Sequence, residues 1–167
     1  MAGALIVLAE LGEADFAWLD ALRRQHYPAE RNRVPAHLTL FRALPPSAEA
    51  EIRRSLARAA ARAAPEAWTS GVIDLGQGVA LRVSSPGLEQ VRDELAGEFH
   101  GLLSAQDLGP WTAHVTVQNK VEVKAVRALL RRMRAEFEPR PLKIRGLQLV
   151  RYADGGWAPL AAWRFRA

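Results

Sequence analysis

The sequence contains no cysteine, so disulfide bonds, thiolate nucleophiles and cysteine-ligated metal sites are all excluded. No apolar run reaches the roughly 18 residues that a membrane-spanning helix needs. Residues 1–10 also lack the basic start and the small-residue cleavage site of a secretory signal. We therefore expect a cytoplasmic protein that does not contact a membrane and draws its chemistry from other side chains.

Lysine is scarce, because only three of the 23 basic residues are lysines (Lys120, Lys124 and Lys143). The others are arginines, and the formal net charge is +5. A guanidinium presents a planar pair of donors that matches a phosphate, so an anionic partner such as RNA fits this composition. The charge alone does not decide the matter, since many arginines fall on expected helix faces where water would solvate them.

Sequence motifs for bound metals and nucleotide phosphates are missing as well. Neither HxxxH nor HExxH spacing occurs. The segment Gly76-Gln77-Gly78 leads into a strand rather than a helix, so we predict a turn there instead of a phosphate-binding loop. We expect neither a metal ion nor an organic cofactor.

Hydrophobic periodicity predicts alternating strands and helices. Strands are expected over residues 4–11, 37–43, 68–75, 79–84, 114–118, 142–152 and 157–166, and helices over 13–27, 48–64, 86–102 and 122–137. Ser47 is expected to cap the second helix and Pro86 to begin the third. Short turns at 76–78 and 154–156 are typical of antiparallel hairpins, so the fold class is α+β.

The two halves of the chain repeat the same order of elements. Residues 4–11 correspond to residues 79–84, and the helix after Ser47 corresponds to the helix after Val121, at an offset of about 75 residues. The repeat suggests a duplication. We predict one bilobal domain, residues 1–167, with pseudo-symmetric halves 1–76 and 77–167, two antiparallel sheets around a central groove, and helices on the outer faces.

Two tetrapeptides of one pattern lie at equivalent places in these halves: His37-Leu38-Thr39-Leu40 and His114-Val115-Thr116-Val117. Successive side chains of a strand alternate between faces, so each motif puts an imidazole and a hydroxyl on one face and two apolar side chains on the other. With four histidines and four threonines in the chain, chance gives such a pair in about 0.3% of cases. We predict that the two polar faces meet across one groove.

These residue types suit the cleavage of a phosphodiester. The reaction needs one group that takes a proton from the nucleophile and another that gives a proton to the leaving oxygen, and histidine can do either near neutral pH. A threonine hydroxyl can donate a hydrogen bond to a phosphate oxygen. The other two histidines, His26 and His100, lack the motif, and we expect them to be structural: His26 at the carbonyl end of a helix, and His100 on the polar side of another.

The paired motifs resemble those of the 2H phosphoesterase superfamily, in particular its 2′-5′ RNA ligase-like members with 2′,3′-cyclic phosphodiesterase activity. The order of elements, Pro35 before the first motif and the closing hairpin over residues 146–161 agree with this resemblance. It implies metal-free hydrolysis of a 2′,3′-cyclic phosphate to a 2′-phosphate. It also implies that His37 is the general acid for the leaving 3′ oxygen and that His114 is the base that activates water.

The resemblance further implies a set of substrate-binding residues. Thr39 and Thr116 would bind the phosphate, and Phe41 would lie either near a base or ribose or in the core. Many members carry an arginine shortly after the second motif, where this chain has Gln118-Asn119-Lys120; Lys120 would supply that charge, or Arg42 after the first motif. Tyr152 is a candidate for a wall of the groove.

The substrates expected from this reading are RNA ends or nucleotides that carry a 2′,3′-cyclic phosphate, and the protein is expected to be a monomer. Two alternatives remain open at this stage. One is reversible 2′-5′ RNA ligation with the same groups, and the other is a basic RNA-binding module that catalyses nothing.

Overall fold

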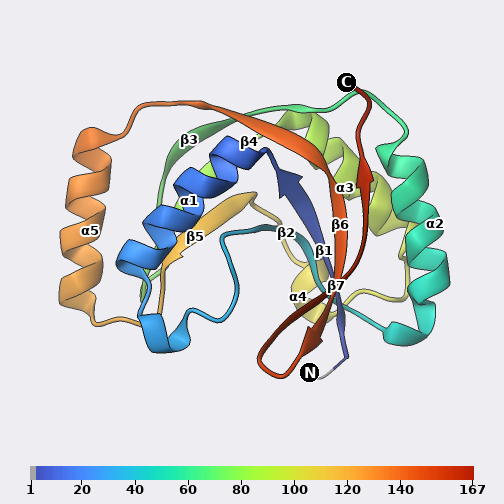
Figure 1. Cartoon of the computed structure of the whole chain (residues 1–167), viewed down its shortest axis with the longest axis horizontal. Coiled ribbons are helices and arrows are strands. Elements are labelled where there is room, and N and C mark those ends of the chain that lie inside the picture. Colours follow the sequence, from blue (N-terminus) through green and yellow to red (C-terminus); the bar gives the residue numbers. More distant parts are fainter. Residues whose placement is uncertain (1–2) are drawn as a thin grey trace.

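The computed structural model describes residues 3–167 and has a mixed α+β architecture (Figure 1). Its strands are β1 (Leu5–Leu11), β2 (Leu38–Leu44), β3 (Glu66–Asp74), β4 (Val79–Ser84), β5 (His114–Gln118), β6 (Pro141–Ala153) and β7 (Gly156–Arg164). Its helices are α1 (Glu13–His26), α2 (Glu49–Ala60), α3 (Pro86–Glu98), α4 (Ala105–Leu108) and α5 (Val123–Glu136), with single 3-10 turns η1 (Ala29–Arg31) and η2 (Pro46–Ala48). The predicted α+β class is confirmed.

All neighbouring strands are antiparallel and follow the order β2-β1-β6-β3-β4-β5, with β7 added beside β6. Where the sequence predicted two sheets, the long strand β6 joins two sections into one seven-stranded sheet. Its first residues pair with β3, and the remainder pairs with β1 and β7. In Figure 1 this strand runs from the side of α5 across the molecule to the side of α2.

The pairing exchanges strands between the two halves of the sequence. β3, from the first half, pairs with β4 of the second, whereas β6, from the second half, pairs with β1 of the first. Each section of the sheet is therefore built from both halves, and neither half can complete its own sheet. The duplication itself stays a prediction, although the order strand, helix, strand, helix, strand does occur twice along the chain.

Most element boundaries agree with the sequence prediction to within two residues, and the second and third helices are the exceptions. Helix α2 starts at Glu49 after the η2 turn and ends at Ala60, so the expected N-cap at Ser47 is wrong. Helix α3 begins at Pro86 as predicted, and the Ser85 hydroxyl accepts a hydrogen bond from the Leu88 amide. The sequence predicted that this helix would continue to residue 102. Residues 99–102 instead form a turn, and the short helix α4 follows it.

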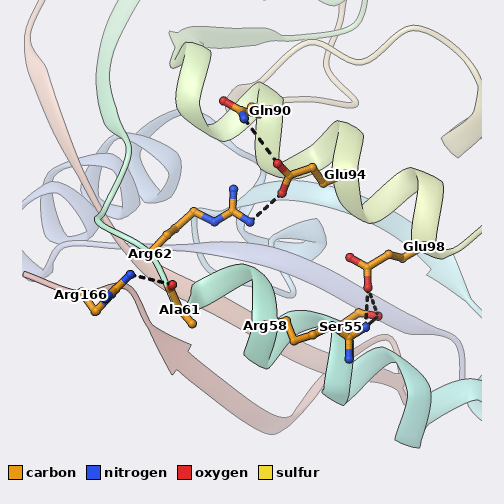
Figure 2. A network of polar contacts seen from close by, with 8 residues as sticks. All are labelled: Ser55, Arg58, Ala61, Arg62, Gln90, Glu94, Glu98 and Arg166. Carbon is orange, nitrogen blue, oxygen red and sulfur yellow. Dashed lines mark hydrogen bonds and ion pairs between the residues drawn. The ribbon is translucent and has the colours of Figure 1, made fainter.

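Helices α2 and α3 lie side by side on the outside of one section of the sheet (Figure 1). Figure 2 shows the polar contacts between them: Arg58 pairs with Glu98 and Arg62 with Glu94, each at 2.6 Å. The Ser55 hydroxyl, which is buried, also donates to Glu98. These partners are largely exposed, so each pair adds only about 0–1 kcal/mol to the free energy of unfolding and mainly fixes the helix alignment.

Helix α5 covers the other section of the sheet, where it packs on β3 and β4. Val126, Leu129 and Leu130 of its apolar face are buried against Val79 and Val117. Helix α1 crosses from β1 to lie beside β5 (Figure 1). Among residues 3–167, no helix is long and apolar enough to cross a membrane.

Candidate active site

The two histidine motifs lie on the strands at the two ends of the sheet path, β2 and β5. These end strands nevertheless approach each other in space, because the sheet curves through β6. His37 immediately precedes β2, and His114 is the first residue of β5. The fold thus brings together two motifs that are remote in the sheet and in the sequence.

The predicted alternation of faces is confirmed in both motifs. Leu38 and Leu40 are at most 1% exposed, and Val115 and Val117 are fully buried. The intervening His and Thr side chains are half-buried and line a shared pocket of about 380 Å³. His37, Thr39, His114 and Thr116 therefore surround one space, as the sequence predicted.

Both imidazoles are held in the same way. The Nδ1–H of His37 donates to the Pro35 carbonyl at 2.8 Å, and the Nδ1–H of His114 donates to the Thr112 carbonyl at the same distance. In each case the acceptor lies two residues before the histidine. The carbonyl fixes the tautomer of each neutral ring, so Nε2 keeps its lone pair for a proton in the pocket.

The pKa of His37 is lowered to about 4. Burial is the main cause, the hydrogen bond to Pro35 opposes it, and the nearby charges of Arg23, Arg42 and His114 lower the pKa further. The ring of His37 also contacts the Trp157 ring edge-on, with 4.6 Å between centroids. At neutral pH this environment therefore holds His37 in its uncharged form.

We predict that His37 stays neutral in NMR titrations of the free protein until the pH approaches 4. Inorganic phosphate should raise this pKa, because a bound anion favours the imidazolium. The measurement is the pH dependence of the imidazole ¹⁵N shifts with and without phosphate, with the His37 signals assigned from a His37→Gln variant. A His37 that titrates near 6.5 without phosphate would show that its ring is open to water.

The walls of this pocket differ in character. Ile73, Leu75, Pro110 and Trp111 contribute apolar surface, and Arg42 and Arg82 contribute positive charge. Arg82 pairs in register with His114 on the neighbouring strand. Such a mixture can accommodate a ribose or base beside an anionic group.

A second pocket, of about 550 Å³, shares His37, Arg42 and Thr116 with the first. The structure places Lys120 and Tyr152 here, and not in the pocket that both histidines line. Lys120 and Tyr152 therefore lie in a pocket next to the one that contains the histidine pair. Of the two residues proposed to supply the positive charge, Lys120 lines only this second pocket and Arg42 lines both.

Comparison with known protein families identifies this arrangement. Residues 11–156 match the family model of the 2′-5′ RNA ligase superfamily. The chain belongs to this superfamily, whose domain is that of the 2H phosphoesterases. It is therefore an enzyme of a phosphoesterase or 2′-5′ RNA ligase family, which confirms the resemblance noted in the sequence.

Solved structures with the same fold include TT0787 of Thermus thermophilus, with a TM-score of 0.70, 18% identity and 98% coverage of both chains. LigT of E. coli in complex with 3′-AMP has a TM-score of 0.67 and 18% identity over 100% of both chains. A crystal structure described as a phosphoesterase gives 0.63 and 19% over 99% of both chains. No curated protein matches the sequence.

This member of the superfamily supports its motif strands with two buried arginines that the sequence analysis did not single out. Arg23 of α1 donates to the Thr116 carbonyl at 3.1 Å, and Arg92 of α3 donates to the Leu40 carbonyl at 3.3 Å and to the Asp107 carbonyl at 2.8 Å. Helix α1 of the first half thus holds β5 of the second half, and helix α3 of the second half holds β2 of the first. No local sequence pattern distinguishes these arginines from the many exposed ones.

Two further side chains fix the first motif. The indole Nε1–H of Trp111 donates to the Thr39 carbonyl at 2.9 Å. The buried carboxylate of Asp107 accepts from the Arg42 amide at 3.0 Å and from the Ala43 amide at 3.2 Å. These bonds hold β2 in place just beyond Thr39, so the hydroxyl and imidazole of the motif have a rigid support.

The structure corrects the prediction for Phe41. Its ring is fully buried and contacts Phe99 at 5.3 Å between centroids, and the Arg92 guanidinium lies 4.5 Å from it. The β1–β2 register shifts between the pairs Val7–Phe41 and Leu8–Thr39, and Leu40 and Phe41 are both buried at this irregularity. The expected contact with a base or ribose is therefore wrong, and the core alternative holds.

The remaining histidines lie outside both motif-lined pockets. His26 ends α1, and its Nε2 lies 3.1 Å from an Arg132 nitrogen of α5; burial and this charge lower its pKa. A neutral His26 accepting from Arg132 therefore replaces the expected contact with helix carbonyls. His100 is exposed in the turn after α3. Within residues 3–167, no three His, Asp or Glu side chains gather closely enough to hold a metal ion.

Proposed function

We propose that this enzyme hydrolyses 2′,3′-cyclic phosphates at RNA ends or in nucleotides, with His37 and His114 as its proton-transfer groups. The observation that supports this most directly is the shared pocket. Two imidazoles and two threonine hydroxyls line it, and both imidazoles have Nδ1 engaged by a carbonyl. This is a complete set of groups for in-line displacement at phosphorus without a metal ion.

In the proposed reaction, the Nε2 of His114 takes a proton from water as the water oxygen forms a bond to phosphorus. The bond from phosphorus to the 3′ oxygen breaks, and His37 donates a proton to that oxygen. The products are a 2′-phosphate and a free 3′-hydroxyl. The hydroxyls of Thr39 and Thr116 donate to phosphate oxygens as charge builds up on them.

This division of roles places one demand on His37. A general acid must carry a proton when the reaction begins, yet the free pocket lowers the pKa of His37 to about 4. The anionic substrate must therefore raise this pKa on binding, because a negative charge beside the imidazolium opposes both the effect of burial, which is the main cause of the low pKa, and the nearby positive charges. If bound phosphate leaves the pKa low, His37 is instead suited to be the base and His114 the acid.

The direct test is incubation with a panel of nucleoside 2′,3′-cyclic phosphates. We expect hydrolysis to 2′-phosphates at an undiminished rate after exhaustive treatment with a metal chelator, with the phosphate position in the product determined by ³¹P NMR. Loss of activity on chelation, restored by a divalent metal, would refute the metal-free mechanism. A 3′-phosphate product would refute the assignment of the leaving oxygen.

The same experiment separates the alternatives. Adding an RNA with a 5′-hydroxyl to an RNA with a cyclic phosphate would yield a joined strand if ligation dominates. A binding module without catalysis would turn over no cyclic phosphate, and its salt-sensitive affinity for RNA would persist after replacement of both histidines.

A further inference from the structure

The second pocket is basic and partly aromatic, and the proposed chemistry does not use most of it. Arg31 and Arg33 enter it from the segment around η1, Lys120 from the turn after β5, and Tyr152 and Trp157 from the β6–β7 hairpin. Three segments that are far apart in sequence thus form its walls. In Figure 1 these segments lie at the same end of the molecule, below β5 and β2.

The positive charge of this pocket is not neutralised by the protein. In the described part of the chain, no carboxylate lies within 4.0 Å of a side-chain nitrogen of Arg31, Arg33 or Lys120, whereas arginines elsewhere form eight such pairs. Glu30 is the one acidic residue among those lining the pocket. Unpaired guanidinium groups in a concave site are suited to bind a phosphate through paired hydrogen bonds.

Backbone geometry at two positions shapes the loops that border this pocket. Lys120 has a left-handed backbone with φ of 60°, which is uncommon for a residue other than glycine and costs free energy. Gly155 at the hairpin tip has φ of 76°, and a Cβ there would lie 3.6 Å from Cδ of Arg33. The hairpin tip therefore packs closely on the arginine segment.

The two pockets are continuous through His37, Arg42 and Thr116, yet they differ in chemistry. Both contain arginines, but the first also has apolar walls suited to a ribose and base, whereas the second has more basic side chains together with a tyrosine and a tryptophan. In single-stranded RNA, phosphates alternate with nucleosides, and proteins bind such strands with basic side chains and aromatic rings that stack on bases.

We propose that the second pocket binds the phosphodiester next to the reacting phosphate in an RNA strand, with Arg31 and Arg33 as its anion-binding residues. This inference rests on the proposed function of the neighbouring site. The enzyme therefore acts on the ends of oligonucleotides in preference to mononucleotides, because only the former carry a second phosphate for this pocket.

The test compares a dinucleotide ending in a 2′,3′-cyclic phosphate with the matching mononucleoside 2′,3′-cyclic phosphate. The wild-type kcat/KM should be at least about tenfold higher for the dinucleotide at low salt. The double variant R31Q/R33Q should remove most of this preference and leave the mononucleotide rate unchanged. The matched control R127Q/R131Q removes the same charge from the exposed face of α5, outside both pockets, and should retain the preference.

Salt dependence gives a second readout. Loss of one phosphate contact should reduce the slope of log kcat/KM against log salt by about 0.7 for the dinucleotide in R31Q/R33Q. Equal losses in both double variants would overturn the proposal, since they would indicate general electrostatic attraction. The absence of any preference in the wild type would overturn it as well.

A binding measurement keeps this inference separate from the proposed reaction. Calorimetry with a dinucleotide and a mononucleoside that both end in a 3′-phosphate requires no turnover. Tighter wild-type binding of the dinucleotide, lost in R31Q/R33Q, supports the second pocket even if no cyclic phosphate is hydrolysed. Hydrolysis of cyclic mononucleotides without tighter binding of the dinucleotide would leave the proposed function intact and refute the second phosphate site.

Discussion

His37→Ala and His114→Ala are each expected to lower kcat/KM for a 2′,3′-cyclic nucleotide by about 10²–10⁴-fold, the usual contribution of a positioned acid or base. Each imidazole lines the same pocket and has its Nδ1 engaged by a carbonyl, so each loss removes one half of a coupled proton transfer. The double variant should be only slightly slower than the slower single variant, because the two groups act as a unit.

The matched control is His100→Ala, since His100 is exposed in a turn and lines neither pocket. Its kcat/KM should equal that of the wild type, and circular dichroism should show that all four proteins are folded. Should either motif variant keep wild-type activity, two-histidine catalysis is wrong for this chain. Loss of RNA binding together with turnover in both variants would instead indicate that the imidazoles chiefly hold the substrate.

The histidine pair could be predicted from sequence because its signal is local. A strand alternates its side chains whatever its surroundings, so the four-residue motifs determine which face is polar and which is buried. The identical acceptor geometry at Pro35 and Thr112 follows from the chain itself, since each carbonyl lies two residues before its histidine. The repeated order of elements then indicated that the two faces belong together.

The supporting residues could not be predicted in this way because they act across the fold. Arg23 and Thr116 are separated by 93 residues and Arg92 and Leu40 by 52, and neither pair has a sequence signature. The exchange of β3 and β6 between halves likewise depends on which edges meet in space. Only the tertiary structure separates these two arginines from the exposed ones on α2 and α5.

Phe41 shows how a local rule fails at an irregular register. Regular alternation from His37 and Thr39 would turn Phe41 toward the groove, but the β1–β2 pairing shifts at this point and the ring is buried. The Asp107 carboxylate, which accepts from the amides of Arg42 and Ala43, holds the strand just beyond the shift. A sequence pattern alone cannot show a register shift, because it depends on the partner strand.

Phe41→Ala is expected to reduce the free energy of unfolding by about 3–5 kcal/mol, the typical cost of truncating a buried phenylalanine. The ring is 0% exposed between Phe99 and Arg92, so its removal leaves a cavity and takes away the aromatic contact of a buried cation. This loss is a large share of the roughly 5–15 kcal/mol that stabilises a typical domain. Urea unfolding followed by circular dichroism measures it.

Phe16→Ala is the matched control, since Phe16 is 37% exposed on α1 and its truncation should cost much less. The milder variant Phe41→Leu keeps most of the apolar volume and should remain folded for kinetics. Its KM for a cyclic nucleotide should equal that of the wild type, because the ring lines neither substrate pocket. A KM that rises while the free energy of unfolding is unchanged would contradict the core assignment and restore Phe41 as a substrate contact.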